Sequence, residues 1–132
     1  MSFASTKALT LRARTEGYAV PAVNIVDGIS LAAAVRAADE LGSPVILQTS
    51  VKTVKYFGAA VLADTARAAA DAASVPVALH LDHCPDRAVI TEAIAHGWSS
   101  VLFDASDRAL DLARAETAEV VAEAHAADVD VE

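Results

Sequence analysis

The sequence predicts an α/β protein built on a parallel sheet, and within that class it favours a (β/α)₈ TIM barrel over an open doubly wound sheet. Short apolar stretches alternate with helical patterns along the chain. Each helix would return the chain to the same edge of the sheet, so neighbouring strands would run parallel. Polar residues collect where the predicted strands end, which is where barrels build their sites, although open sheets also bind ligands there. No GxGxxG or GxxxxGK[ST] motif follows the first predicted strand, which weakens the dinucleotide and P-loop alternatives.

The predicted elements follow one another in regular order. Each helix is predicted from apolar residues that recur every three or four positions and from the residues that cap it, and each strand from a short apolar run that ends in polar residues. The segment 51–58 between the second strand and its helix is predicted to be a loop. In chain order the elements are a helix from Ser5 or Thr6 to Gly17, strand 18–26, helix 27–42, strand 45–48, a helix after the loop with Leu62, Ala66, Ala69 and Ala73 on its apolar face, strand 75–84, a helix that carries Val89 to Ile94 and ends at Gly97, strand 101–103, helix 110–124 and the start of a strand at 129–132.

Length and composition indicate one globular unit that is about half of a barrel. The 132 residues are 55% hydrophobic, with a mean hydropathy of +0.39, which indicates a substantial core rather than disorder. A complete barrel needs roughly 250 residues. Residues 1–132 are therefore expected to form the amino-terminal half of a barrel domain, with about four strand–helix units and the start of a fifth strand, and the chain is interpreted as truncated.

Charge and the amino terminus exclude several classes of partner. A net charge of -8 argues against nucleic acid or an anionic membrane as the main partner, because both are bound through an excess of Lys and Arg. No apolar run approaches the roughly 20 residues of a membrane span, and MSFASTK does not resemble a signal peptide. A cytoplasmic protein is expected. The single Cys84 excludes an internal disulfide.

The stretch SVPVALHLDHC, residues 74–84, is the most informative part of the chain. Its apolar run is typical of a strand buried on both faces, and it ends in His80, Asp82 and His83. In an extended chain His80 and Asp82 lie on one side and Leu81 on the other. An imidazole and a carboxylate at such a strand end can bind a divalent metal and transfer a proton, but a simple hydrogen-bonded pair is an equally good interpretation of these residues alone.

Four motifs resemble one enzyme family in order and spacing. YAVPAVN, PVILQTS, HLDHC and SVLFDAS are similar to the amino-terminal half of the class II, metal-dependent ketose-bisphosphate aldolases. The resemblance covers essentially the whole chain, and HLDHC is its most specific part. It implies a (β/α)₈ barrel and a lyase of glycolysis or related carbohydrate metabolism. Such an enzyme uses Zn²⁺ to cleave a fructose or tagatose type of ketose 1,6-bisphosphate reversibly to dihydroxyacetone phosphate and glyceraldehyde 3-phosphate.

The resemblance also implies roles for five residues. Asp82 matches the catalytic acid/base and His83 a ligand of the catalytic zinc. Asn24 matches a substrate-binding residue near the reacting ketone, with a strand-end cap as its alternative. Ser50 matches a substrate-binding serine, with capping of its own segment as the alternative. Asp104 matches a ligand of a second, more peripheral divalent or monovalent cation, and its alternative is a salt-bridged strand end.

Other residues receive no site role, and other functions stay open. His80 is expected to be a buried, hydrogen-bonded histidine, while Lys52 and Lys55 are expected to be solvated. Glu132 matches the first residue of a family glutamate pair, and the remaining metal ligands and phosphate loops would lie beyond it. Two alternatives are a non-catalytic half-barrel interaction module that pairs with itself, and another metal-dependent barrel lyase. A phosphorylated sugar is the expected partner, and a homo-oligomer the expected state.

Overall fold

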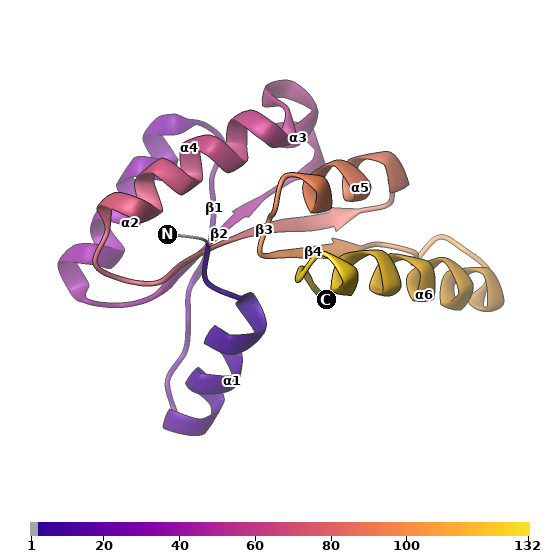
Figure 1. The fold of residues 1–132 in the computed structure, drawn as a ribbon, viewed down its shortest axis with the longest axis horizontal. Coiled ribbons are helices and arrows are strands. Elements are labelled where there is room, and N and C mark those ends of the chain that lie inside the picture. Colours follow the sequence, from indigo (N-terminus) through magenta and orange to yellow (C-terminus); the bar gives the residue numbers. More distant parts are fainter. Residues whose placement is uncertain (1–2) are drawn as a thin grey trace.

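A computed structural model describes residues 3–132 and shows a five-stranded parallel sheet. The strands lie side by side in chain order, β1-β2-β3-β4-β5, as each helix returns the chain to the position next to the strand it has just left (Figure 1). Every neighbouring pair is parallel, as the sequence predicts. The strands are β1 (Ala22–Asn24), β2 (Val45–Thr49), β3 (Val77–Cys84), β4 (Ser100–Phe103) and β5 (Asp130–Val131).

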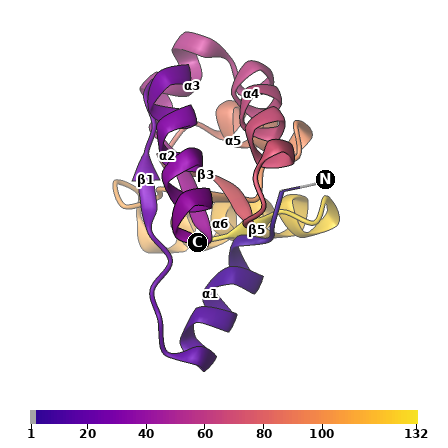
Figure 2. The ribbon, with the colours of Figure 1, turned by 90° about the vertical axis from the view of Figure 1, so that its left-hand side faces the viewer.

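The helices cover one face of the sheet and one of its ends. Helices α2, α4, α5 and α6 lie along the same face of the sheet, and α1 stands apart at the amino-terminal ends of the strands (Figures 1 and 2). The short helix α3 follows the carboxyl end of β2. The helices are α1 (Thr6–Glu16), α2 (Gly28–Leu41), α3 (Val51–Phe57), α4 (Ala59–Ala72), α5 (Arg87–Ala95) and α6 (Leu110–Ala126).

The main core lies between the sheet and its covering helices. Leu79 and Leu81 of β3 point into this core and are completely buried. A smaller cluster of Leu9, Ile46 and Ala78 lies under α1. Because successive side chains of a strand point to opposite faces, the burial of Leu79 and Leu81 leaves the neighbouring polar side chains of β3 for the other face of the sheet, which is where a barrel has its interior.

Two predicted elements differ in the structure. The strand predicted at 18–26 is restricted to Ala22–Asn24, because Pro21 has no N–H to donate to a ladder and β1 pairs only with β2. The segment 51–58, predicted to be a loop, forms the helix α3. Its first turn is capped by Ser50, whose Oγ accepts from Thr53 N at 3.3 Å. The next helix, α4, begins at Ala59, directly after this segment, and buries Leu62 and Ala66 of the predicted apolar face.

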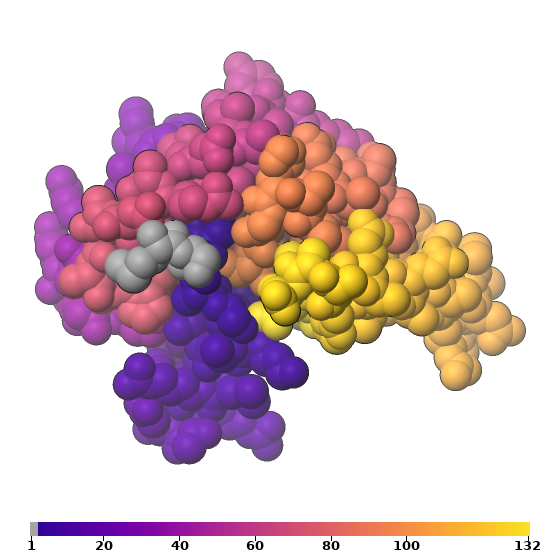
Figure 3. Space-filling model, viewed as in Figure 1, coloured from indigo at the N-terminus to yellow at the C-terminus, as the bar shows by residue number. Residues whose placement is uncertain are grey.

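The sheet has two open edges, and parts of the surface are apolar. All three residues of β1 are exposed. Ile29, Leu41, Tyr56 and Leu110 are each more than 70% exposed, and the space-filling view shows α1 and one end of α6 projecting from the body (Figure 3). Among the described residues, no helix combines the length and apolarity that crossing a bilayer requires.

Candidate active site

All five predicted site residues lie at the carboxyl ends of strands β1 to β4, with Ser50 directly after β2. The parallel register pairs Asn24 of β1 with Gln48 of β2, and Gln48 with His80 of β3. Asp82 and His83 follow at the end of β3, and Asp104 comes directly after β4. Carboxyl ends of parallel strands meet at one edge, so residues far apart in sequence come together there.

His83 is presented by an irregularity in β3. The register between β3 and β4 shifts between Leu81 and Cys84, and His83 has φ 84, a left-handed conformation that is uncommon for residues other than glycine. The bulge turns the His83 ring outward, so that its side chain is 63% exposed. The sequence predicts that His83 lies at the strand end or in the loop, but the strained bulge was not predictable from it.

His83 and Asp104 form a hydrogen-bonded ion pair. Nδ1 of His83 lies 3.0 Å from Oδ2 of Asp104, and this hydrogen bond is the main reason why the pKa of His83 is raised above its ordinary value. The pKa of Asp104 is lowered to about 2, first by hydrogen bonds from the side chain and backbone of Ser106 and then by the bond from His83. Asp104 is therefore ionised at neutral pH, and it holds the imidazole through one ring nitrogen.

Asp82 is oriented by a residue to which the sequence analysis gave no role. Nε2 of Gln48 donates to Oδ2 of Asp82 at 3.0 Å and to Oδ1 of Asn24 at 3.3 Å. The other carboxylate oxygen, Oδ1, lies 3.9 Å from Nε2 of His83. Gln48 thus joins two predicted site residues, and its position at the end of the second predicted strand was the signal that could have identified it.

His80 is buried and hydrogen-bonded, as expected. Its side chain is 4% exposed, and Nδ1 shares a hydrogen bond of 2.7 Å with Oγ of Ser100, which in turn shares one of 2.7 Å with Oγ1 of Thr6. Burial lowers the pKa of His80 below its ordinary value, against the opposing effects of Glu132 and Asp82. Its other ring nitrogen, Nε2, lies 3.4 Å from Oε2 of Glu132. His80 therefore connects the site to the packing of α1.

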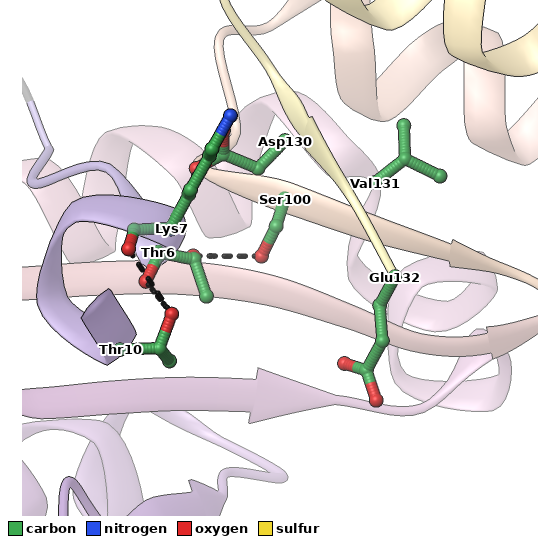
Figure 4. Close-up of a pocket in the computed structure, with 7 residues that line it drawn as sticks. All are labelled: Thr6, Lys7, Thr10, Ser100, Asp130, Val131 and Glu132. Carbon is green, nitrogen blue, oxygen red and sulfur yellow. Dashed lines mark hydrogen bonds between the residues drawn. The ribbon is translucent and has the colours of Figure 1, made fainter. Parts of the chain in front are cut away.

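A pocket of about 390 Å³ lies on the α1 side of the sheet, separate from His83 and Asp104. It is lined by Thr6, Lys7, Thr10, Ser100, Asp130, Val131 and Glu132, and Figure 4 shows that these residues come from α1, from the start of β4 and from the last residues of the chain. Oδ2 of Asp130 accepts from Oγ of Ser5 and from the backbone N of Lys7, both at 2.8 Å. Asp130 thereby stabilises the first turn of α1.

Ser50, the remaining predicted site residue, and Lys55, which received no site role, lie at the edge of the candidate site. Ser50 is exposed and caps α3 through its hydroxyl, which is the alternative that the sequence left open. Lys55 forms an exposed salt bridge of 2.7 Å with Asp86, so its ammonium group joins α3 to the start of α5.

His83 fits the role of one zinc ligand. A metal-binding histidine commonly donates its second ring nitrogen to a carboxylate, which orients the ring, and Asp104 stands in that relation to Nδ1. Nε2 is beyond hydrogen-bond distance of Asp82. Over residues 3–132, however, no group of three or more His, Cys, Asp or Glu side chains is arranged to hold a metal ion. Because a catalytic zinc usually has three protein ligands, a complete site would need ligands from elsewhere.

The parallel sheet has its strands in chain order and helices along one face, which is the architecture of part of a (β/α)₈ barrel. Its carboxyl edge, where such barrels place their sites, carries carboxylate, imidazole and amide groups. The sequence model of the family "Fructose-bisphosphate aldolase class-II" matches residues 4–132, and the chain belongs to this family. The resemblance carried by the four motifs is thereby confirmed.

Individual relatives agree with this family. The chain is 41% identical over 121 residues to a fructose-bisphosphate aldolase of Thermus caldophilus, covering 92% of this chain and 39% of that relative. It is 37% identical over 132 residues to the D-tagatose-1,6-bisphosphate aldolase subunit GatY of Klebsiella oxytoca, covering 100% of this chain and 46% of that relative.

A solved structure of this family shows the same fold. The fructose-bisphosphate aldolase of Campylobacter jejuni superposes with a TM-score of 0.87 at 28% identity, covering 98% of this chain and 46% of that chain. The chain thus spans less than half the length of each of these three proteins.

Proposed function

We propose that this chain is the amino-terminal half of a zinc-dependent class II aldolase, which reversibly cleaves a ketose 1,6-bisphosphate to dihydroxyacetone phosphate and glyceraldehyde 3-phosphate. The observation that carries the proposal is the convergence of Asp82, His83 and Asp104 at the carboxyl edge of the sheet in a member of this family. Fructose and tagatose bisphosphates differ at C4, and relatives with both names match the chain, so both sugars are candidate substrates.

Each residue has a role that suits aldol cleavage. Asp82 accepts the proton of the C4 hydroxyl as the bond between C3 and C4 breaks, and in the reverse direction it returns that proton. A zinc ion, held in part by His83, would supply a Lewis acid for the neighbouring carbonyl when bound. Asn24 points its Oδ1 toward Gln48, which leaves the Nδ2 hydrogens of Asn24 for an oxygen of the substrate. Asp104 orients His83 and offers a carboxylate to a second cation.

The test is an aldolase assay of the complete protein with fructose and tagatose 1,6-bisphosphates. Activity should disappear with EDTA, return with Zn²⁺ and resist borohydride, because the proposed chemistry uses a metal and no lysine Schiff base. Activity that survived EDTA and was trapped by borohydride would contradict the proposal.

The isolated chain of 132 residues should behave differently from a complete barrel. The open edges at β1 and β5 expose backbone donors and acceptors, so the chain should self-associate or fold poorly. It should also have negligible aldolase activity, since His83 alone does not make a catalytic zinc site. Sedimentation velocity and a zinc-supplemented assay measure both properties. A folded, active monomer would overturn the assignment of this chain as half of a barrel.

A further inference from the structure

The guanidinium group of Arg108 joins the two loops that present the candidate site. Arg108 lies in the loop between β4 and α6, and its side chain is only 20% exposed. Its Nη1 donates to the carbonyl oxygen of Asp104 at 2.9 Å. Its Nη2 donates to the carbonyl oxygen of Pro85 at 2.9 Å. One planar group therefore bridges the loop after β3 and the loop after β4.

Three further contacts hold this guanidinium. Its Nη1 also donates to Oδ1 of the neighbouring Asp107 at 3.1 Å. Cζ of Arg108 lies 5.0 Å from the centre of the Phe103 ring, so the group is placed over an aromatic face. Nε lies 2.5 Å from Oε2 of Glu116 on α6, but this oxygen lacks hydrogen-bond geometry, so the contact is an ion pair. The bridge is thus anchored both to the last residue of β4 and to the following helix.

The two bridged carbonyl groups belong to the backbone that presents His83 and Asp104. Pro85 follows His83 by two residues, on the far side of the register shift in β3. Asp104 is held at its carbonyl oxygen by Arg108, at its carboxylate by His83 and Ser106, and at its backbone N, which donates to the carbonyl oxygen of Cys84 at 3.0 Å. The left-handed conformation of His83, with φ 84, is strained and persists only where its surroundings enforce it. Arg108 supplies part of that enforcement.

We propose that Arg108 is a positioning residue for the zinc ligand His83. By binding the carbonyl oxygens of Pro85 and Asp104 together, it adds to the backbone hydrogen bond from Asp104 N to Cys84 O and helps to fix the separation of the two loops, and hence the orientation of the His83 imidazole. The inference rests on the proposed function, because it assumes that His83 binds zinc. A lysine cannot replace the bridge, since an ammonium group lacks the planar fork that reaches two acceptors at once.

The test compares Arg108→Lys and Arg108→Ala with a matched control, Arg114→Lys, in the complete protein. Arg114 is an exposed arginine of α6 that lies beside Ala113 and Thr117. Zinc affinity is measured by chelator competition, and kcat and KM are measured by steady-state kinetics. The thermal midpoint of unfolding is measured on the zinc-free proteins. Both Arg108 variants should lose about 10- to 100-fold in zinc affinity and in kcat, with KM little changed. Arg114→Lys should match the unsubstituted protein.

The outcomes separate this inference from the proposed function. If the unsubstituted protein binds zinc but cleaves no ketose bisphosphate, the proposed function fails, and the zinc affinities of the variants still decide the role of Arg108. Zinc affinity and kcat in Arg108→Lys within twofold of the control would overturn the inference, whatever Arg108→Ala does, because a bridge that lysine can replace is not the one proposed. A protein that binds no zinc overturns both.

Discussion

His80 and His83 lie three residues apart, yet the fold gives them opposite environments. His80 is 4% exposed and bound to Ser100, whereas His83 is 63% exposed and paired with Asp104. Burial lowers the pKa of His80, and the hydrogen bond with Asp104 raises that of His83. The imidazole of His80 forms a buried hydrogen bond within the fold, while the imidazole of His83 is oriented by Asp104 and remains accessible to solvent.

The difference arises from the backbone and not from the residue type. Had β3 continued regularly, alternation would have turned His83 to the side of Leu81, toward the helices. The register shift after Leu81 and the left-handed conformation of His83 prevent this. A local irregularity therefore converts a histidine of a buried strand into a candidate metal ligand, which is a common use of bulges beside active sites.

Asp82, between the two histidines, should show the largest effect on turnover. Asp82→Asn in the complete protein should lower kcat by about 10²- to 10⁴-fold, because it removes the proton acceptor and conserves the shape. Zinc content and thermal midpoint should stay unchanged. Kinetics with metal analysis on the same sample measure both, and near-normal turnover would refute the role of Asp82.

Alanine substitution of each histidine should separate metal binding from stability. His83→Ala should lower zinc affinity at least as much as loss of a supporting residue does, by more than about 10- to 100-fold, with little change in the free energy of unfolding. His80→Ala should cost about 1–3 kcal/mol of that free energy, because it removes a buried hydrogen-bonding partner. Chelator competition and urea unfolding are the measurements. Equal loss of zinc affinity in His83→Ala and His80→Ala would contradict the assignment of zinc binding to His83 and of stability to His80.

The pKa values of the two imidazoles should lie on opposite sides of the ordinary value of 6.5, with that of His80 below it and that of His83 above it. The stability that His80 contributes in its neutral form is present above pH 6.5 and is lost as the pH falls toward its lowered folded pKa. The contribution of the charged His83 is present below pH 6.5 and is lost as the pH rises through its raised folded pKa. NMR titration of the ring protons in the metal-free protein tests this order, and a His80 that titrates above His83 would contradict it.

The smallest expected effect is a change in the pKa of His83 when Asp104 is replaced. Asp104→Asn should bring the pKa of His83 back toward 6.5, because the carboxylate that accepts from Nδ1 loses its charge. The pKa of His80 should change much less, because Asp104 does not act on it directly and reaches it only through the charge of His83, which lowers that pKa. The same NMR titration measures both rings, and an unchanged His83 would show that the ion pair is not formed in solution.

Much of the architecture was predictable because it depends on local periodicity. Alternating apolar strands and amphipathic helices predicted the parallel sheet in its observed form, and the alternation within 74–84 placed His80 opposite Leu81. The helix α3 was missed because its seven residues are too few for a clear helical period and its start depends on the Ser50 cap.

The sequence by itself determined the fold class, the order of the strands and the residues that collect at their carboxyl ends, because hydrophobic period and chain order are local properties. Only the tertiary structure decided how these residues meet. The amide of Gln48 reaches Asp82 across 34 positions, and Arg108 reaches Pro85 across 23. Such contacts depend on the register of neighbouring strands and on the strained conformation of His83. No pattern within a single segment carries that information, since each contact exists only after the sheet has brought two separate loops to the same edge.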